Sequence, residues 1–317
     1  MTASIGILLY PGVQMSAVLG LTDLFGVADG IGGQTPAAPR ICVHHVATDD
    51  GVPHSVFSSD QGRAGSPSHD VLILPPSLSA PITPEAAAPL ANWLRARHAE
   101  GAVLASVCAG AFLLGETGLL AGRSVTTHWT HAQALQDRFP RAKVDADRLI
   151  IDGGDIISAG GLMSWTDLGL KLVDRFLGPV AMAATARMML VDPPGREQRY
   201  YSGFVPRLTH GDAAILKAQH VLQASEGRDA RLDTLAEAAG LEERTFLRRF
   251  QKATGLTATD YAQRLRVAKA QELLQFGQQP VERIAWDVGY GDPGAFRKVF
   301  LRIVGLTPGA YRQRFQA

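Results

Sequence analysis

Two kinds of hydrophobic pattern divide the chain. Up to about residue 190, short continuous apolar runs alternate with longer helical stretches. The runs are Ile5–Tyr10, Val71–Leu74 and Val103–Val107, and each predicts a parallel strand buried on both faces. The stretches that predict helices are Ala17–Asp29, Pro84–His98, Ala109–Thr117, Trp165–Phe176 and Pro179–Leu190. This alternation predicts an α/β sandwich around a parallel sheet.

The first 190 residues also predict a hairpin, and the sequence shows no pattern of a signal peptide, a membrane span or a disulfide framework. The segment Leu149–Ile157 has two apolar halves around Gly153-Gly154, which predicts a hairpin near the sheet edge. No basic segment precedes an apolar one at the start, and no apolar run approaches about 18 residues, so we expect neither signal peptide nor membrane span. Cys42 and Cys108 give no disulfide framework, which favours a cytoplasmic location.

The last hundred residues contain an internal repeat with a spacing of fifty positions. The matched segments are Phe246–Phe250 with Phe296–Phe300, Gly255–Thr257 with Gly305–Thr307, and Tyr261–Arg264 with Tyr311–Arg314. Because all three matches keep one register, they are not a chance similarity. A unit of this length is too long for a solenoid turn and suits a small helical subdomain used twice.

Each repeat predicts a helix, a glycine turn and a second helix. The predicted pairs are Leu232–Gly240 with Glu243–Thr254, and Val281–Gly289 with Gly294–Val304. Helix, tight turn and helix are the parts of a helix-turn-helix, whose second helix enters the major groove of DNA. Ala236 and Ala285 fit this interpretation because the two helices must approach closely.

The second helix of each repeat has an apolar and a basic side. Phe246 and Phe250 stand at i and i+4, as do Phe296 and Phe300, so each pair faces the core. The spacing turns outward the candidate DNA-binding residues, which are Arg244, Leu247, Arg248, Arg297 and Lys298. The alternative is that these are ordinary helix pairs whose exposed arginines are only solvated.

Charge is distributed unevenly along the chain. The whole chain has a net charge of +1, but from Ile215 onward 16 Lys and Arg face 11 Asp and Glu, a net of +5. The remaining residues have 15 against 19, a net of −4. A basic C-terminal part on an acidic N-terminal part favours a phosphate-binding domain attached to one that does not bind DNA.

The repeat resembles the AraC/XylS family of transcription regulators. The resemblance covers Asp212–Phe315, and its most specific block runs from Ile284 to Tyr311, with Ala285–Tyr290 and Gly305–Arg312. It implies a bipartite domain in which a long helix, about Ala258–Phe276, holds the two units apart. It also implies recognition helices in successive major grooves about 34 Å apart, and RNA polymerase as a partner if the protein activates transcription.

One cysteine stands at a corner between a predicted strand and a predicted helix. In Ser106–Ala111, Cys108 follows the strand and small residues open the helix. In such an elbow the thiol projects into a cleft, and the helix N-terminus lowers its pKa. His128, about twenty residues later, is the candidate imidazole. The alternative is a buried, inert cysteine and a structural histidine.

The first 190 residues resemble the PfpI/class I glutamine amidotransferase-like fold, a flavodoxin-like parallel-sheet sandwich. The motifs are Cys108–Gly110, Thr126–Trp129 and Ser158–Gly161. Enzymes of that fold add an acidic residue in the loop after the first strand, but here the position falls on Ala17, and Val13–Leu19 has no carboxylate. We therefore expect a binding pocket without catalysis, metal or cofactor, made by Cys108, Ala109, Gly110, His128 and Ala17.

Together the resemblances indicate a GlxA-type member of AraC/XylS. The predicted domains are a sensor (1–190), a linker (191–211) and a DNA-binding domain (212–317). The expected function is a homodimeric, sequence-specific transcriptional regulator that senses a small nitrogenous metabolite and is not an enzyme. Two alternatives stay open: a PfpI-type cysteine hydrolase or hydratase with Cys108 as nucleophile and His128 as base, and a DNA-bending or scaffold protein without ligand.

Overall fold

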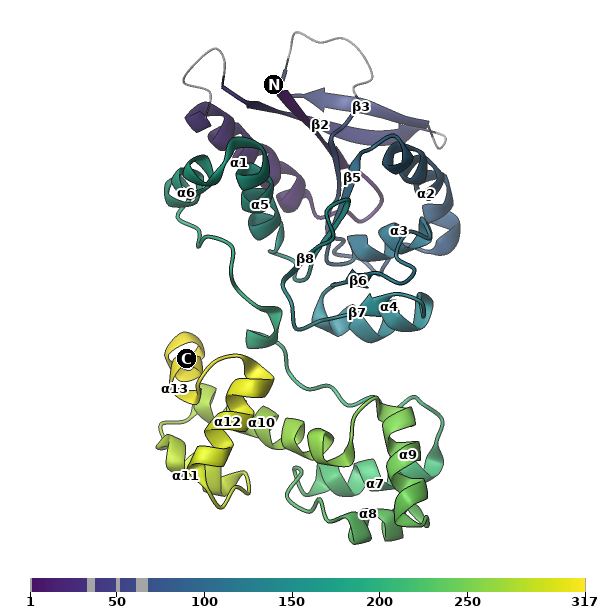
Figure 1. Cartoon of the computed structure of the whole chain (residues 1–317), viewed down its shortest axis with the longest axis vertical. Helices are drawn as coiled ribbons and strands as arrows, with labels where there is room; N and C mark the ends of the chain where they lie inside the picture. Colours follow the sequence, from purple (N-terminus) through teal and green to yellow (C-terminus); the bar gives the residue numbers. More distant parts are fainter. Residues whose placement is uncertain (1, 33–37, 50–51, 61–67, 317) are drawn as a thin grey trace. The chain divides into compact units, whose positions relative to one another are not determined.

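The chain folds into two compact units. The computed structural model describes residues 2–32, 38–49, 52–60 and 68–316, and it divides into Met1–Gln198 and Arg199–Ala317 (Figure 1). The division falls inside the segment 191–211, for which the sequence predicts irregular structure. The first unit contains the sheet, and the described part of the second unit is helical apart from its connecting segments.

The described residues of the first unit form a seven-stranded sheet with the order β3-β2-β1-β4-β5-β9-β8. The strands are β1 (Thr2–Leu8), β2 (Arg40–Asp49), β3 (Val52–Ser58), β4 (Val71–Leu74), β5 (Val103–Val107), β8 (Ile150–Asp152) and β9 (Ile156–Ala159). The inner strands pair in parallel, and the edge strands β3 and β8 are antiparallel to their neighbours. The predicted sheet and edge hairpin are confirmed, whereas β2 and β3 were not predicted.

Helices cover both faces of this sheet, and each face has its own core. The helices α1 (Met15–Gly32), α5 (Trp165–Leu177) and α6 (Pro179–Met188) pack on one face. Opposite them lie α2 (Pro84–Ala99), α3 (Gly110–Glu116) and α4 (Ala132–Arg138). A small two-stranded sheet, β6 (Ser124–Val125) with β7 (Lys143–Val144), adjoins α4. Helix α4 and this small sheet were not predicted.

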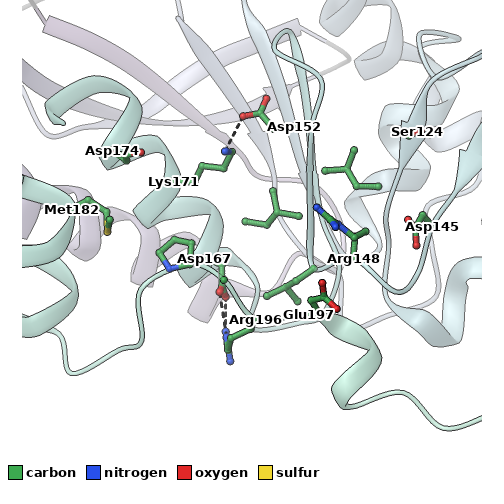
Figure 2. Close-up of a pocket in the computed structure, with 15 residues that line it drawn as sticks. Ser124, Asp145, Arg148, Asp152, Asp167, Lys171, Asp174, Met182, Arg196 and Glu197 are labelled. Carbon is green, nitrogen blue, oxygen red and sulfur yellow. Dashed lines mark hydrogen bonds and ion pairs between the residues drawn. The ribbon is translucent and has the colours of Figure 1, made fainter. Parts of the chain in front are cut away.

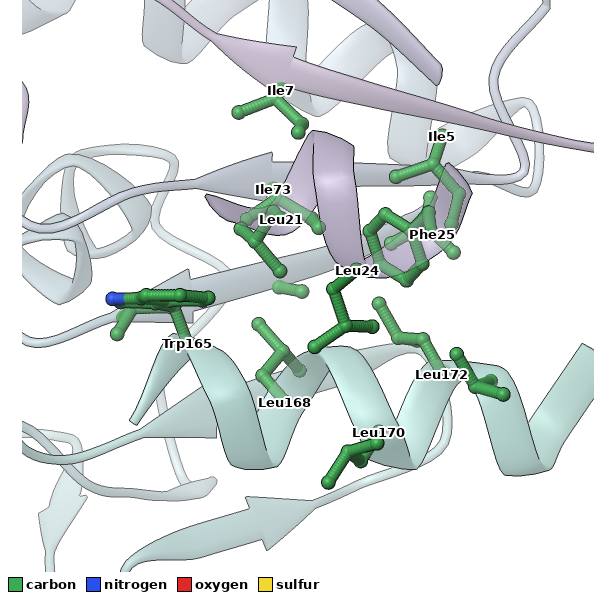
Figure 3. Close-up of a cluster of buried hydrophobic side chains, with 14 of the residues drawn as sticks. Ile5, Ile7, Leu21, Leu24, Phe25, Ile73, Trp165, Leu168, Leu170 and Leu172 are labelled. Carbon is green, nitrogen blue, oxygen red and sulfur yellow. The ribbon is translucent and has the colours of Figure 1, made fainter. Parts of the chain in front are cut away.

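Helix α1 packs closely against α5. Leu21, Leu24 and Phe25 of α1 meet Leu168 and Leu172 of α5 in a cluster of fully buried side chains (Figure 3). A methyl group at Gly20 would stand only 2.4 Å from the indole of Trp165, so the contact between the helices requires glycine there. This packing closes one face of the sheet.

The hydropathy of α1 is high enough for a membrane span. Its 18 residues have a mean hydropathy of 1.2, a length and composition that core helices of globular proteins can share. Six of its side chains, from Ala17 to Ala28, are fully covered by the sheet and by α5 and α6. Packing inside the first unit therefore accounts for the apolar composition of α1.

The second unit has two cores joined by one long helix. Its helices are α7 (Ala213–Ala224), α8 (Leu232–Ala239), α9 (Glu243–Thr254), α10 (Ala258–Phe276), α11 (Val281–Asp287), α12 (Pro293–Val304) and α13 (Pro308–Phe315). Tyr261 in the first half of α10 lies in the core with α7, α8 and α9. Leu274 in its second half lies in the core with α11, α12 and α13. The predicted long helix is confirmed.

Candidate DNA-binding surface and ligand site

The two helix-turn-helix units are built alike. Gly240 and Gly289 have φ values of 64° and 86°, the left-handed region that ends a first helix sharply. The next N–H donates back, from Leu241 to Ala236 O and from Tyr290 to Ala285 O. The predicted close approach agrees with the burial of both alanines. Sequence alone is therefore enough to predict this motif.

The second helices, α9 and α12, start differently. Asp292 caps α12, with its carboxylate accepting hydrogen bonds from the N–H groups of Gly294 and Ala295, both at 2.9 Å. These bonds lower the pKa of the Asp292 carboxyl. The cap of α9, Glu242, makes no such side-chain bond. Both helices nevertheless bury their phenylalanine pairs completely, as predicted.

The outward sides of α9 and α12 contain the five residues singled out from the sequence. Arg244, Leu247 and Arg248 are exposed on α9, and Arg297 and Lys298 are exposed on α12. Among the residues that the structure describes, Arg244, Arg248 and Lys298 have no ion-pair partner. Arg297 instead pairs with Glu282 of α11. Three cationic groups are thus free to meet phosphates or base edges.

One arginine of the α9 motif has a structural contact. Arg249 donates to both carboxylate oxygens of Asp212, at 3.0 and 2.7 Å, while its neighbour Arg248 is exposed. The Arg249 guanidinium holds the pKa of the Asp212 carboxyl below its usual value. Asp212 in turn accepts from the N–H of Ile215 and so caps α7. This contact ties the second helix of the first repeat to α7.

Cys108 occupies a strained corner between β5 and α3. Its φ of 52° is in the left-handed region, which non-glycine residues seldom adopt outside special sites. The Cys108 N–H donates to Ala159 O at 2.8 Å, which holds the corner against β9. A methyl group at Gly110 would stand 2.2 Å from Leu74 O, so the helix can begin there only with glycine. The predicted strand-to-helix corner at Cys108 is confirmed, whereas the thiol, which was expected to project into a cleft, is buried in the core instead.

The thiol of Cys108 does not have the lowered pKa predicted for it. The side chain is 1% exposed, and burial raises the pKa of the thiol to about 11. The N–H groups of Ala109 and His128 act in the opposite direction but more weakly. The expectation of a lowered pKa was wrong because α3 has only seven residues and the site is almost dry.

His128 is close to the elbow, but its ring is engaged elsewhere. Nδ1 accepts from the N–H of Thr130 at 3.2 Å and lies 2.7 Å from Thr130 Oγ1. Burial, and then the charge of His131, lower the pKa of His128. Within the described part of the chain, the ring and the thiol of Cys108 share no hydrogen bond; the thiol meets the His128 backbone instead.

Ala17 lies in the first turn of α1 and is fully buried. Because α1 begins at Met15, most of the segment Val13–Leu19, which was expected to be a loop, is helical. Ala17 belongs to the same core cluster as Cys108 and Ala109.

Tyr10 is a residue that the sequence analysis missed. Its hydroxyl donates to Pro75 O, and burial, followed by the charge of Cys108, raises the pKa of Tyr10. A phenol that interacts electrostatically with Cys108 was therefore not expected from the sequence.

A second missed residue is Gln198. Its side chain is buried, and Nε2 donates to Thr127 O and Ala146 O, both at 2.9 Å. Oε1 accepts from the N–H of Trp129 at 3.0 Å. Gln198 thus bonds to residues on both sides of His128. A polar residue in an irregular segment gives no sequence signal for such a role.

Comparisons with known proteins agree with both parts of this description. Residues 235–314 match the helix-turn-helix domain family model, and residues 52–175 match the DJ-1/PfpI family model. The transcriptional regulator GlxA of Rhizobium meliloti is 29% identical over 68% of this chain and 66% of its own length. The regulator GbdR of Pseudomonas aeruginosa is 27% identical over 70% of this chain and 60% of its own.

A solved structure shows a weaker likeness. An AraC family transcriptional regulator from Pseudomonas putida is 17% identical with a TM-score of 0.45, covering 59% of this chain and 99% of that one. The matched regions span two thirds or less of GlxA and GbdR. These relatives are named as transcriptional regulators rather than enzymes. The chain therefore combines a DJ-1/PfpI domain, matched over residues 52–175, with a helix-turn-helix domain, matched over residues 235–314, and it is similar to the transcriptional regulators GlxA and GbdR.

Proposed function

We propose that this chain is a sequence-specific, DNA-binding regulator whose first unit senses a small metabolite. The observation that supports this most is the pair of outward basic helices, α9 and α12, on repeated helix-turn-helix units. On each, a buried phenylalanine pair fixes the helix, so that Arg248 or Lys298 is presented to solvent from a rigid support. Rigid presentation favours base reading over loose phosphate contact.

DNA selection with the full chain tests this proposal. The operator is obtained by enriching bound duplexes from a random library, and affinity is then measured over a salt series. Arg248→Ala and Lys298→Ala should each cost about 1–3 kcal/mol at one half of the operator only. Lys217→Ala is a matched control, because Lys217 is an exposed, unpaired lysine of the described part of α7 outside the recognition helices. Equal loss in all three variants would contradict the assignment of the recognition faces.

The sensor site proposed from the sequence is the elbow, with Cys108, Ala109, Gly110, His128 and Ala17. The backbone N–H groups of Ala109 and His128 act to lower the pKa of the thiol, and the same groups would favour a polar or anionic ligand atom at this position. The five residues are largely covered, so a ligand has to displace neighbouring side chains to enter. A protonated thiol without a carboxylate partner supports binding without turnover.

Ligand screening tests the elbow. Small nitrogenous metabolites that bind there should raise the melting temperature of the full chain, and Cys108→Ala should change that response. A reaction abolished by Cys108→Ala would instead favour the hydrolase or hydratase.

We also propose that the protein is a cytoplasmic homodimer, and that RNA polymerase is a partner if the protein activates transcription. Sedimentation of a monomer with and without DNA would contradict the dimer.

A further inference from the structure

Arginine side chains fasten separate segments to one another in both units of the chain. In the first unit, a cavity of about 760 Å³ beside the β8–β9 hairpin is lined by α5 on one side and by the segment 194–197 on another (Figure 2). Arg196 of that segment donates to the buried carboxylate of Asp167 on α5, at 2.5 and 3.3 Å. The arginine thus holds an irregular segment in place as part of the cavity wall. In the second unit, Arg266 makes such a link between the two repeats.

Arg266 lies at the point of α10 where the two cores of the second unit meet. The residue before it, Leu265, packs on the first core, made with α7, α8 and α9, and the residue after it, Val267, belongs to the second core, made with α11, α12 and α13. Among the described residues, the buried apolar side chains of the two cores form separate clusters. Arg302 of α12 adds a polar contact, to Gln263 of α10 at 2.5 Å. The orientation of one core relative to the other therefore depends on α10 and on the polar contacts beside it.

The guanidinium of Arg266 contacts loops of both cores. It donates to Gly227 O at 2.7 Å and to Arg228 O at 3.2 Å, in the loop between α7 and α8. A third hydrogen bond goes to Gly289 O at 3.1 Å, in the turn between α11 and α12. A methyl group at Gly289 would stand 2.9 Å from Cγ of Arg228, so this turn and this loop also touch directly. One side chain on α10 thus joins a loop of the first core to the helix-turn-helix turn of the second.

Tyr290 connects Arg266 to the recognition helix α12. The guanidinium lies 5.4 Å from the centroid of the Tyr290 ring, a cation–π contact. The ring of Tyr290 in turn packs against Phe296 of α12, with centroids 5.5 Å apart. In the first repeat, Leu241 takes the place of Tyr290, and its N–H makes the same backward hydrogen bond. The contact with the tyrosine ring is therefore an addition at the junction of the repeats, and the helix-turn-helix motif forms without it.

We propose that Arg266 is a positioning residue, which fixes the second helix-turn-helix unit relative to the first and so determines the separation of the two half-sites that the protein binds. A planar guanidinium presents several N–H donors in a fixed fork, so a single group holds three carbonyl oxygens and a ring at once. A lysine at this position would keep the charge and lose the fork. The role in DNA binding rests on the proposed function, whereas the junction itself exists without DNA.

Operators with altered spacing test this role in the full chain. One base pair is added or removed between the half-sites of the selected operator, which moves one half-site by about 3.4 Å and rotates it by about 35°. The unaltered chain should bind each altered duplex at least about tenfold more weakly, because its two recognition helices are held rigidly. In Arg266→Lys and Arg266→Ala, affinity for the selected operator should fall about threefold to tenfold, and the loss caused by altered spacing should shrink to below about threefold.

Duplexes with a single half-site separate positioning from folding. Both Arg266 variants should bind each single half-site within about twofold of the unaltered chain, because each helix-turn-helix unit keeps its own core. Arg264→Ala is the matched control, since it removes the same charge from α10 two positions earlier, about 200° around the helix. This control should keep the full loss caused by altered spacing. An undiminished loss in both Arg266 variants overturns the proposal, as does an equally large loss of binding to single half-sites.

A distance measurement without DNA tests the junction directly. Gln251→Cys and Leu301→Cys place spin labels at equivalent exposed positions of α9 and α12 in a Cys42→Ala chain, where the remaining Cys108 is buried. The distribution of distances between the labels should be narrow with Arg266 and clearly broader in Arg266→Lys and Arg266→Ala. An unchanged distribution in both variants overturns the proposal. Failure to select any operator would count against the proposed function alone, because the label distances still decide the role of Arg266.

Discussion

Arg249 and Asp212 lie 37 positions apart and form a two-point ion pair that joins the recognition helix of the first repeat to the start of α7. Arg248, the next residue toward the N-terminus, has no such partner among the described residues. Two adjacent arginines of one motif therefore have different roles. One positions the helix, and the other is available to DNA.

This difference gives a first prediction. Asp212→Ala removes the cap of α7 together with the partner of Arg249, and we expect a loss of about 1 kcal/mol or somewhat more in the free energy of unfolding. Arg248→Ala should leave the free energy of unfolding unchanged and weaken DNA binding. Urea denaturation and operator binding, measured on both variants, check this. Destabilisation by Arg248→Ala would contradict it.

The pair between Arg297 and Glu282 gives a second prediction. Both side chains are about half exposed, so the pair itself contributes little to stability. In the bound complex, however, Arg297 must exchange Glu282 for DNA. Glu282→Gln should therefore tighten operator binding about twofold to fivefold at low salt, with a smaller effect at high salt. Glu237→Gln, which removes an exposed carboxylate from α8, is the control.

The raised pKa of Cys108 gives a third prediction. In a Cys42→Ala chain, where Cys108 is the remaining cysteine, iodoacetamide should react at pH 8 at least about 100-fold more slowly than with the same chain in urea. The thiol is neutral in the folded chain up to about pH 11, so it contributes stability that is present below the ordinary thiol pKa of about 9 and is lost between pH 9 and 11. Fast labelling of the folded chain would contradict this burial.

Two glycines give a fourth prediction, in which replacement by alanine destabilises the fold at one position and stabilises it at the other. Gly110→Ala places a methyl group 2.2 Å from Leu74 O, so the backbone has to move, and we expect a loss of about 1–3 kcal/mol in unfolding free energy. Gly26 lies within α1 and has open space around its Cβ position, so Gly26→Ala should stabilise by about 0.5–1 kcal/mol. Thermal melting of both variants measures the contrast.

Sequence patterns predict the elements whose burial is periodic or continuous. The strands β4 and β5 and the helix α9 have the bounds expected from the sequence pattern, and α10 has those implied by the family resemblance. Strand β2 was missed because His44 and His45 interrupt its apolar run. Both are buried in the sheet, and His45 Nε2 lies 2.7 Å from Thr22 Oγ1. A contact with α1 therefore allows a polar residue at a core position, and the pattern of one strand cannot reveal it.

The candidate sites also depend in part on contacts between distant segments, which local sequence patterns cannot reveal. The elbow and the exposed residues of α9 and α12 follow from local spacing, so the sequence is sufficient to find them. The pKa of Cys108 depends on burial by distant segments, and the role of Gln198 depends on backbone atoms more than fifty positions away. The cavity beside β8 also combines α5 with the segment 194–197. Such contacts exist only after folding.

Because both cores of the second unit share α10, the two recognition helices are linked by a helix of fixed pitch. Each residue added to the middle of α10 would move one core by about 1.5 Å and rotate it by about 100° relative to the other. A single insertion would therefore turn one recognition helix away from the groove. About seven residues, close to two full turns, would be needed to restore its direction. The spacing between operator half-sites can consequently change only in large steps, while the bases read within each half-site can change one at a time.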